Sequence, residues 1–111
     1  MSAHSRQDRS ARDAIEALGI GDDGALWIKP ESSSFPYIYR AGMGVSWDSA
    51  QLRLRGAKPK ELSHAQWFRQ ILSAARDEHG VLLALTPETR WSNIGADLRH
   101  EIEALPPLGV T

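Results

Sequence analysis

Residues 63–85 read SHAQWFRQILSAARDEHGVLLAL and combine a helical period with an uncharged apolar run. Ser63 and Gln66 form a capping box, and Gly80 ends the helical pattern. The apolar side chains between them fall on one face of a helix: Trp67, Phe68, Ile71, Leu72 and Ala75. We therefore expect a helix over about 64–79, followed by a strand from Val81 to Leu85 with both faces covered.

Upstream of this helix, residues 25–55 change to the two-residue period of β-strands, interrupted by Gly, Pro, Ser and Asp. The pattern predicts strands at 25–29 and 37–41, a third around Met43, Val45 and Trp47, and a fourth around Leu52 and Leu54. In the last two strands these apolar side chains should face the helices. Ser46, Asp48, Gln51, Arg53 and Arg55 should face the other way.

The two ends of the chain have helical spacing. Ala11, Ala14, Ile15 and Leu18 share one face of an expected helix over about 6–18, which Gly19 should cap. Near the other end, apolar residues from Trp91 to Leu105 predict a last helix, which starts near Pro87 or near Asn93 and ends at Pro106.

The order of elements is thus α-β-β-β(β)-α-β-α, and it predicts the α+β class. The expected architecture is a two-layer sandwich of a mixed, mostly antiparallel sheet of four or five strands with three helices. The helix before the last strand should form a crossover that places this strand parallel to a neighbour. We expect residues 1–111 to form a single domain, with flexible tails at 1–5 and 106–111.

The composition is that of an ordinary globular protein. The chain has 111 residues, a formal net charge of -1 and 41% hydrophobic residues. The charge balance makes nucleic acid an unlikely partner, and the absence of cysteine excludes disulfides and thiolate metal sites. No apolar run suits a secretory signal or a membrane span, so we expect a soluble, cytoplasmic protein without membrane contact.

Motifs for catalysis are missing, so enzymatic activity is left open, with no catalytic residue, metal or cofactor predicted. The four histidines have no metal-binding spacing. The order of elements also occurs in restriction-endonuclease-like nucleases, but the chain lacks the acid-x-Lys triplet that their metal chemistry needs. A hydrolase or nuclease is the least favoured interpretation.

The candidate binding surface is a sheet face rich in tyrosine and arginine, both residue types that interfaces favour. Its predicted partner-binding residues are Tyr37, Tyr39, Arg40, Arg53 and Arg55. Residues 40–60 contain five basic side chains and one acidic one, which favours a contact that includes carboxylates. These observations predict a small interaction or accessory domain that binds a protein partner or itself as a homodimer.

The main alternative is a small-molecule-binding domain. Trp27 and Trp47 would then line an aromatic pocket between the sheet and the helices, as aromatic walls do in many ligand sites.

Overall fold

A computed structural model describes residues 11–56 and 62–106 of the chain. Its strands are β1 (Ala11–Ile20), β2 (Leu26–Pro30), β3 (Val45–Asp48), β4 (Arg53–Gly56), β5 (Val81–Ala84) and β6 (Arg90–Ser92). Its α-helices are α1 (His64–His79) and α2 (Ala96–Glu103), and η2 (Ile38–Ala41) is a short 3-10 helix. The tail expected at residues 1–5 lies outside the described residues, as does all but Pro106 of the tail expected at 106–111.

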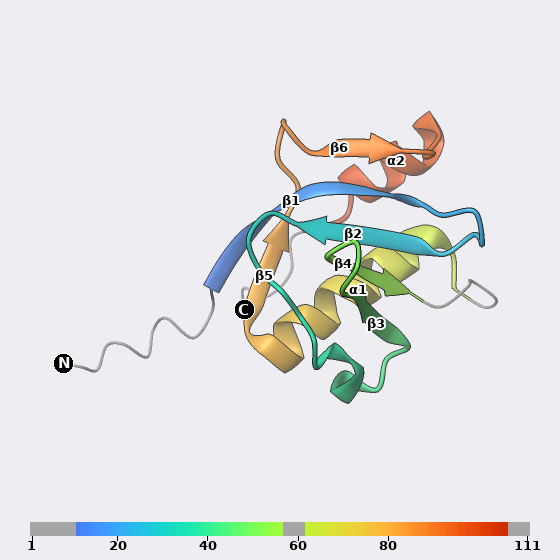
Figure 1. The fold of residues 1–111 in the computed structure, drawn as a ribbon. Coiled ribbons are helices and arrows are strands. Elements are labelled where there is room, and N and C mark those ends of the chain that lie inside the picture. The colour runs from blue at the N-terminus through green and yellow to red at the C-terminus, as the bar shows by residue number, and fades with distance from the viewer. Residues whose placement is uncertain (1–10, 57–61, 107–111) are drawn as a thin grey trace.

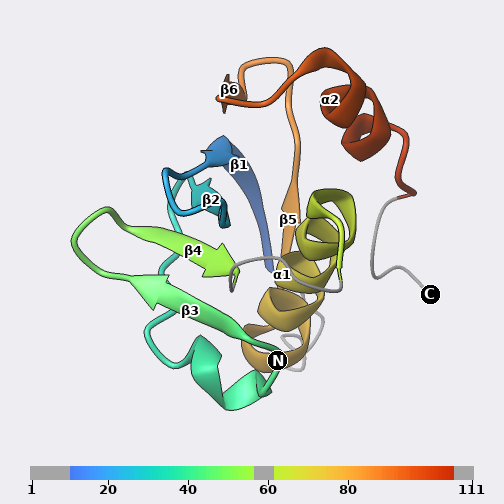
Figure 2. The ribbon, with the colours of Figure 1, turned by 90° about the vertical axis from the view of Figure 1, so that its right-hand side faces the viewer.

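The six strands form one mixed sheet in the order β3-β4-β2-β1-β5, with β6 also paired to β1 (Figure 1). The β1–β2, β2–β4 and β3–β4 pairs are antiparallel, whereas β5 and β6 run parallel to β1. Both α-helices lie on the same side of the sheet (Figure 2). The α+β class, the mixed sheet and the parallel placement of the strand after α1 are confirmed.

Helix α1 forms where the sequence predicts it. The hydroxyl of Ser63 accepts the N–H of Gln66, and the side-chain oxygen of Gln66 accepts the N–H of Ser63. Gly80 takes a left-handed conformation that ends the helix. Local capping and the apolar stripe therefore agree with the packing of this helix on the sheet.

The core lies between the sheet and the helices. Trp67, Phe68, Ile71, Leu72, Leu83 and Ile102 are buried there with Ile15, Leu18, Ile28 and Leu54. Four apolar residues are only partly buried against this core: Val81, Leu85, Ile94 and Leu98. The apolar face of α1 thus has the predicted register.

The expected helix over 6–18 is wrong, because its described part lies in β1. Ala11 to Ala14 pair with β5, and residues 15–20 pair with β2. Ala, Glu and Leu favour a helix locally, but contacts with three strands outweigh that preference. Gly19 pairs with Trp27 inside the sheet and caps no helix.

Residues 37–41 do not form the expected strand. Ile38 to Ala41 form η2, and Gly42 ends it in a left-handed conformation. Ile38 is buried while Tyr37 and Tyr39 are exposed, so the alternation that indicated a strand is produced by one helical turn with a single inward residue.

The C-terminal region differs as well. Residues 90–92 extend along β1 as β6, and α2 starts only at Ala96, after Gly95 as its N-cap. The helical spacing of Trp91 and Ile94 is therefore coincidental. Residues 11–56 and 62–106 thus contain six strands and two α-helices, where the sequence predicts four or five strands and three helices.

Neither α-helix of the described residues has the length and hydropathy needed to cross a membrane.

Candidate interaction surface

The sheet has an open face, which we define as the side of β2, β3 and β4 that neither helix covers (Figure 2). Register assigns side chains to it, because directly opposite residues of antiparallel strands share a face. Leu54 is opposite both Ile28 and Trp47 and belongs to the core side. The neighbouring positions belong to the open face: Trp27, Lys29, Ser46, Asp48, Arg53 and Arg55.

Arg53 is the central cation of the open face. Its guanidinium carbon lies 4.5 Å from the centroid of the Trp27 ring, in a cation–π arrangement. Its Nε is 3.8 Å from Oδ2 of Asp48, too far for a hydrogen bond, and is buried without a hydrogen-bond partner among the described residues. Stacking therefore orients the guanidinium, while its hydrogen-bonding capacity is left largely unused.

The backbone below Trp27 supports this stack. A Cβ added at Gly19 would lie 2.7 Å from Cζ2 of Trp27 and 2.6 Å from the carbonyl oxygen of Ser92. The indole therefore lies directly against β1, in space that only a glycine leaves free. Trp27 thus lies between Gly19 and Arg53.

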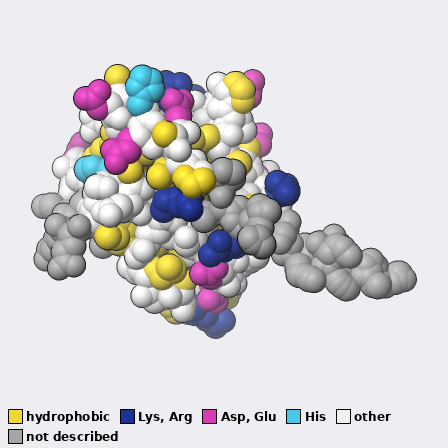
Figure 3. Space-filling model, turned by 180° about the vertical axis from the view of Figure 1, so that it is seen from behind, with side chains coloured by type: hydrophobic (Ala, Val, Ile, Leu, Met, Phe, Trp, Pro, Cys, Tyr) yellow, Lys and Arg dark blue, Asp and Glu magenta, His cyan; other side chains and the backbone are white. Residues whose placement is uncertain are grey.

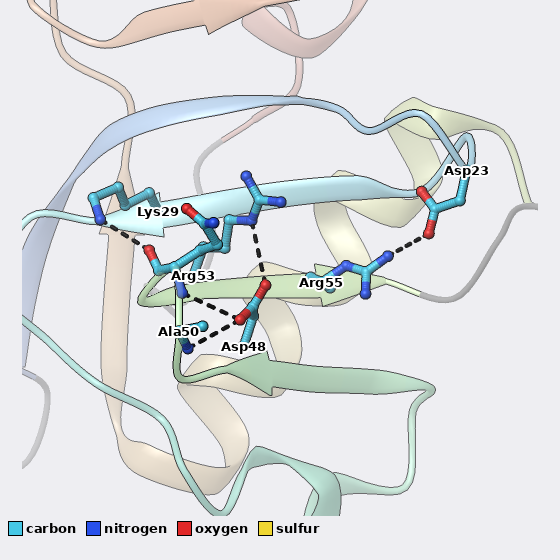
Figure 4. Close-up of polar contacts among 7 residues, drawn as sticks. Asp23, Lys29, Asp48, Ala50, Arg53 and Arg55 are labelled. Carbon is cyan, nitrogen blue, oxygen red and sulfur yellow. Dashed lines mark hydrogen bonds and ion pairs between the residues drawn. The ribbon is translucent and has the colours of Figure 1, made fainter.

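Arg55 is neutralised within the chain. Its guanidinium donates to Oδ2 of Asp23, in the turn between β1 and β2 (Figure 4). The backbone N–H of Ala25 lowers the pKa of Asp23, and the charge of Arg55 lowers it further. Arg53 and Arg55 thus each lie beside one carboxylate, Arg55 in a hydrogen-bonded pair with Asp23 and Arg53 in a looser ion pair with Asp48.

The turn between β3 and β4 forms one end of the open face. Oδ1 of Asp48 accepts the N–H groups of Ala50 and Gln51 at 3.1 and 3.2 Å, and Nζ of Lys29 donates to the carbonyl of Gln51 at 3.0 Å (Figure 4). These contacts fix the four-residue turn that precedes Arg53.

Leu52 lies in this turn. The sequence predicts instead that it belongs to a strand and faces the helices. Its φ is 56°, in the left-handed region that a leucine rarely adopts, and its side chain is 54% exposed. The alternation of Leu52 with Leu54 suggests a strand, and no signal in the sequence indicates that Leu52 has a left-handed backbone in a turn.

Tyr37, Tyr39 and Arg40 do not lie on the sheet. They belong to the region of η2, which packs against α1 and β3. Arg40 lies 4.9 Å above the Tyr37 ring, and both tyrosines are exposed, 6.4 Å apart between ring centroids. The structure thus divides the predicted tyrosine and arginine surface between η2 and the open face, and a binding role for the tyrosines stays a prediction.

The structure does not bring Trp27 and Trp47 together. Trp27 is opposite Arg55 on the open face, whereas Trp47 is opposite Leu54 on the core side. Trp47 packs edge-on against the buried Phe35, with ring centroids 5.8 Å apart. One pocket lined by both indoles is therefore incompatible with the register of the sheet.

Candidate metal ligands do not gather in the described part of the chain, where no group of three His, Asp or Glu side chains could hold an ion. His64 contacts the carbonyl oxygen of Gly24 through Nε2 at 2.9 Å, and His79 stacks edge-on against Phe35. Both side chains take part in packing contacts at opposite ends of α1.

Comparison with known proteins gives one family. Residues 13–89 match the family described as Integron Cassette Protein Hfx_Cass5. A solved structure described as "Structure from the mobile metagenome of North West Arm Sewage Outfall: Integron Cassette Protein Hfx_Cass5" is 43% identical, covering 81% of this chain and 90% of that chain, with a TM-score of 0.43. No curated protein matches the chain.

Proposed function

The chain belongs to the Hfx_Cass5 family of integron cassette proteins, and we propose that it is a non-catalytic interaction domain that binds a protein partner through the open face. The observation that carries the proposal is the combination of a stacked arginine with an exposed, strained leucine. Arg53 is held on Trp27 with unused donors, and Leu52 stands beside it in a left-handed conformation.

The chemistry of the surface defines the partner. The open face and its edge carry Lys29, Arg53 and Arg55 against Asp23 and Asp48, so cations are in excess. Arg53 can donate to a carboxylate through its terminal nitrogens while it stays stacked on Trp27. We therefore propose a partner that presents an acidic side chain next to an apolar one, the latter to cover Leu52.

The strain at Leu52 supports a binding role. A leucine in the left-handed region costs about 1 to 2 kcal/mol, and asparagine or glycine would remove much of that cost. The half-exposed Leu52 side chain gains little burial from the fold in return. Such a residue has a clear use if a partner buries it.

The test is a selection of displayed random peptides against the protein, followed by affinity measurement on variants. Arg53→Glu should weaken binding of the selected peptides roughly tenfold or more, as expected for a central arginine contact. Leu52→Asn should weaken binding as well while raising the melting temperature. The selected peptides should contain Asp or Glu beside apolar residues.

Arg99→Glu is the matched control, because Arg99 stacks on Trp91 at 4.7 Å in the same manner but outside the open face. This variant should retain binding within about twofold, since its arginine takes no part in the proposed contact. Equal losses for Arg53→Glu and Arg99→Glu, or selected peptides without acidic residues, would show that the open face is not the binding surface.

The cytoplasmic location expected from the sequence stays a prediction, and the open face does not depend on it.

A further inference from the structure

The two edges of the sheet are protected to very different degrees. At one edge, β3 carries Asp48 and has η2 packed against it. At the other edge, β5 consists of Val81, Leu82, Leu83 and Ala84, without a charge, a proline or a bulge. No strand in residues 11–56 and 62–106 pairs with the far side of β5. Natural proteins usually protect such an edge, because its free backbone groups can pair with another strand.

The burial of β5 agrees with an edge position. Ala84 is exposed and Val81 and Leu82 are only half-buried, so the sequence-based expectation of a strand with two covered faces is wrong. Leu83 alone is buried. Three of the four aliphatic side chains of β5 are therefore not fully buried in the core of a single chain.

An apolar groove, which we call the edge groove, runs beside β5 between α1 and α2 and has a volume of about 570 Å³. Its apolar lining includes Phe68, Leu72, Leu83, Leu85, Ile102 and Leu105. Apolar side chains are visible among basic and acidic ones on the face of the molecule that carries the helices (Figure 3). Residues of β5 line the edge groove, so the groove lies next to the strand edge that no other described strand pairs with.

Four charged side chains also line the edge groove, and their signs balance. Arg12 and Arg69 are basic, while Asp13 and Glu103 are acidic. The guanidinium of Arg69 donates to the carbonyl of Pro106, which fixes the end of α2 beside the groove. A strongly charged partner would meet as much repulsion as attraction here, whereas a surface with the same balance would be complementary.

We propose that the occupant is a second copy of this chain, with β5 of each copy pairing antiparallel to β5 of the other across a two-fold axis. The axis requires the same patch on both subunits, and a patch of balanced charge can face its own copy without net repulsion. The pairing gives partners to the backbone groups on both free edges and joins the two sheets into one. Aliphatic side chains of each β5 then enter the edge groove of the other copy.

The first experiment measures the mass of the full chain in solution by sedimentation, for the wild type and for Ala84→Lys. The Ala84 side chain is exposed, so lysine leaves the fold of one subunit intact but places a charge on the pairing strand of each copy. We expect a dimeric wild type and roughly tenfold or more weaker association in Ala84→Lys. Ala96→Lys, at an exposed position at the start of α2, is the matched control and should remain a dimer. A monomeric wild type, or unchanged association in Ala84→Lys, would overturn the proposal.

A second measurement uses the absence of cysteine from the chain. Ala84→Cys should give a covalent dimer with a short bismaleimide cross-linker, and Ala96→Cys should not, because only position 84 belongs to the pairing strand. Equal yields from the two variants would contradict pairing through β5.

The dimer is independent of the proposed binding through the open face. Leu52→Asn and Arg53→Glu should leave the mass unchanged while they weaken peptide binding, and Ala84→Lys should do the opposite. If Leu52→Asn dissociates the dimer and Ala84→Lys does not, self-association belongs to the open face and the β5 pairing is refuted.

Discussion

The hydroxyl of Thr89 donates a 2.7 Å hydrogen bond to the carbonyl oxygen of Ile15, which lies 74 residues earlier in the chain. The same hydroxyl accepts the N–H of Thr86 at 2.9 Å, and Thr89 is a buried polar side chain. Residues 86–89 therefore form a turn, and the Thr89 hydroxyl links this turn to β1 by a hydrogen bond. This contact sets the point at which the chain leaves β5 and returns to β1 as β6.

Replacing Thr89 by valine tests this fastening. Thr89→Val keeps the shape of the side chain but leaves the Thr86 N–H and the Ile15 carbonyl without this partner, and should cost about 1 to 3 kcal/mol of unfolding free energy. Urea unfolding measures the loss. Glu88→Gln, at an exposed position of the same turn, should change stability by less than about 0.5 kcal/mol. Comparable losses in both variants would mean that the hydroxyl contributes nothing specific.

The register of α1 is tested at Ile71, which is fully buried. Ile71→Ala should destabilise the protein by roughly 2 to 5 kcal/mol, because it leaves a cavity between α1 and the sheet. Denaturant unfolding at pH 7 gives the value. A loss below about 0.5 kcal/mol would be typical of a surface position and would contradict the packing.

Gly19→Ala should strain the centre of the sheet. The added methyl group would meet the Ser92 carbonyl oxygen at 2.6 Å, and backbone cannot move aside as a flexible side chain can. We expect a loss of about 1 to 3 kcal/mol together with a change in Trp27 fluorescence. Gly95→Ser is the control, because nothing lies within 4 Å of its new Cβ and serine suits the N-cap. It should change stability by only a few tenths of a kcal/mol.

Asp13 should make stability depend on pH. Its carboxylate accepts the N–H groups of Ser32, Ser33 and Ala14 at 2.8 to 3.0 Å. Burial raises the pKa of Asp13, but the hydrogen bonds outweigh burial and hold the pKa below the ordinary value of 3.8. The folded state therefore gains stability from the carboxylate above about pH 4, and loses it as the pH falls through the lower folded pKa.

Asp13→Asn measures this contribution. The variant should be less stable than the wild type by about 1 to 2 kcal/mol at pH 7, where the charged acceptor is lost. The difference should shrink as the pH is lowered from 5 to 2 in a series of urea titrations. A difference that stays constant over this range would rule out the carboxylate charge as the cause.

Local signals explain which parts of the fold could be predicted. The limits of helix α1 are set by capping residues next to its ends, namely Ser63, Gln66 and Gly80, so they can be predicted from the local sequence alone. The β3–β4 hairpin also forms between adjacent segments, and the inward positions of Val45, Trp47 and Leu54 are as expected. Short-range contacts make such elements visible in one sequence.

The sequence-based predictions are wrong mainly where contacts between distant parts of the chain determine the secondary structure. Residues 11–18 satisfy a helical period, yet their strand partners lie in β5 and β6, far along the chain. The sequence predicts the candidate surface only in part: it indicates Arg53 and Arg55, but the stacking on Trp27 and the pairing with Asp23 depend on sheet register. It places Leu52 on the wrong side, because a left-handed backbone angle leaves no pattern in the surrounding residues.

Strand β1 also has a consequence for how the chain is made. It precedes every other described strand in synthesis, but β5 and β6, which complete its pairing, follow after α1. A nascent chain that ends before Thr89 lacks the contact to Ile15, and closure of this 74-residue span waits for the last third of the protein. The sheet is therefore completed late in translation, and until then β1 lacks the two strands that run parallel to it.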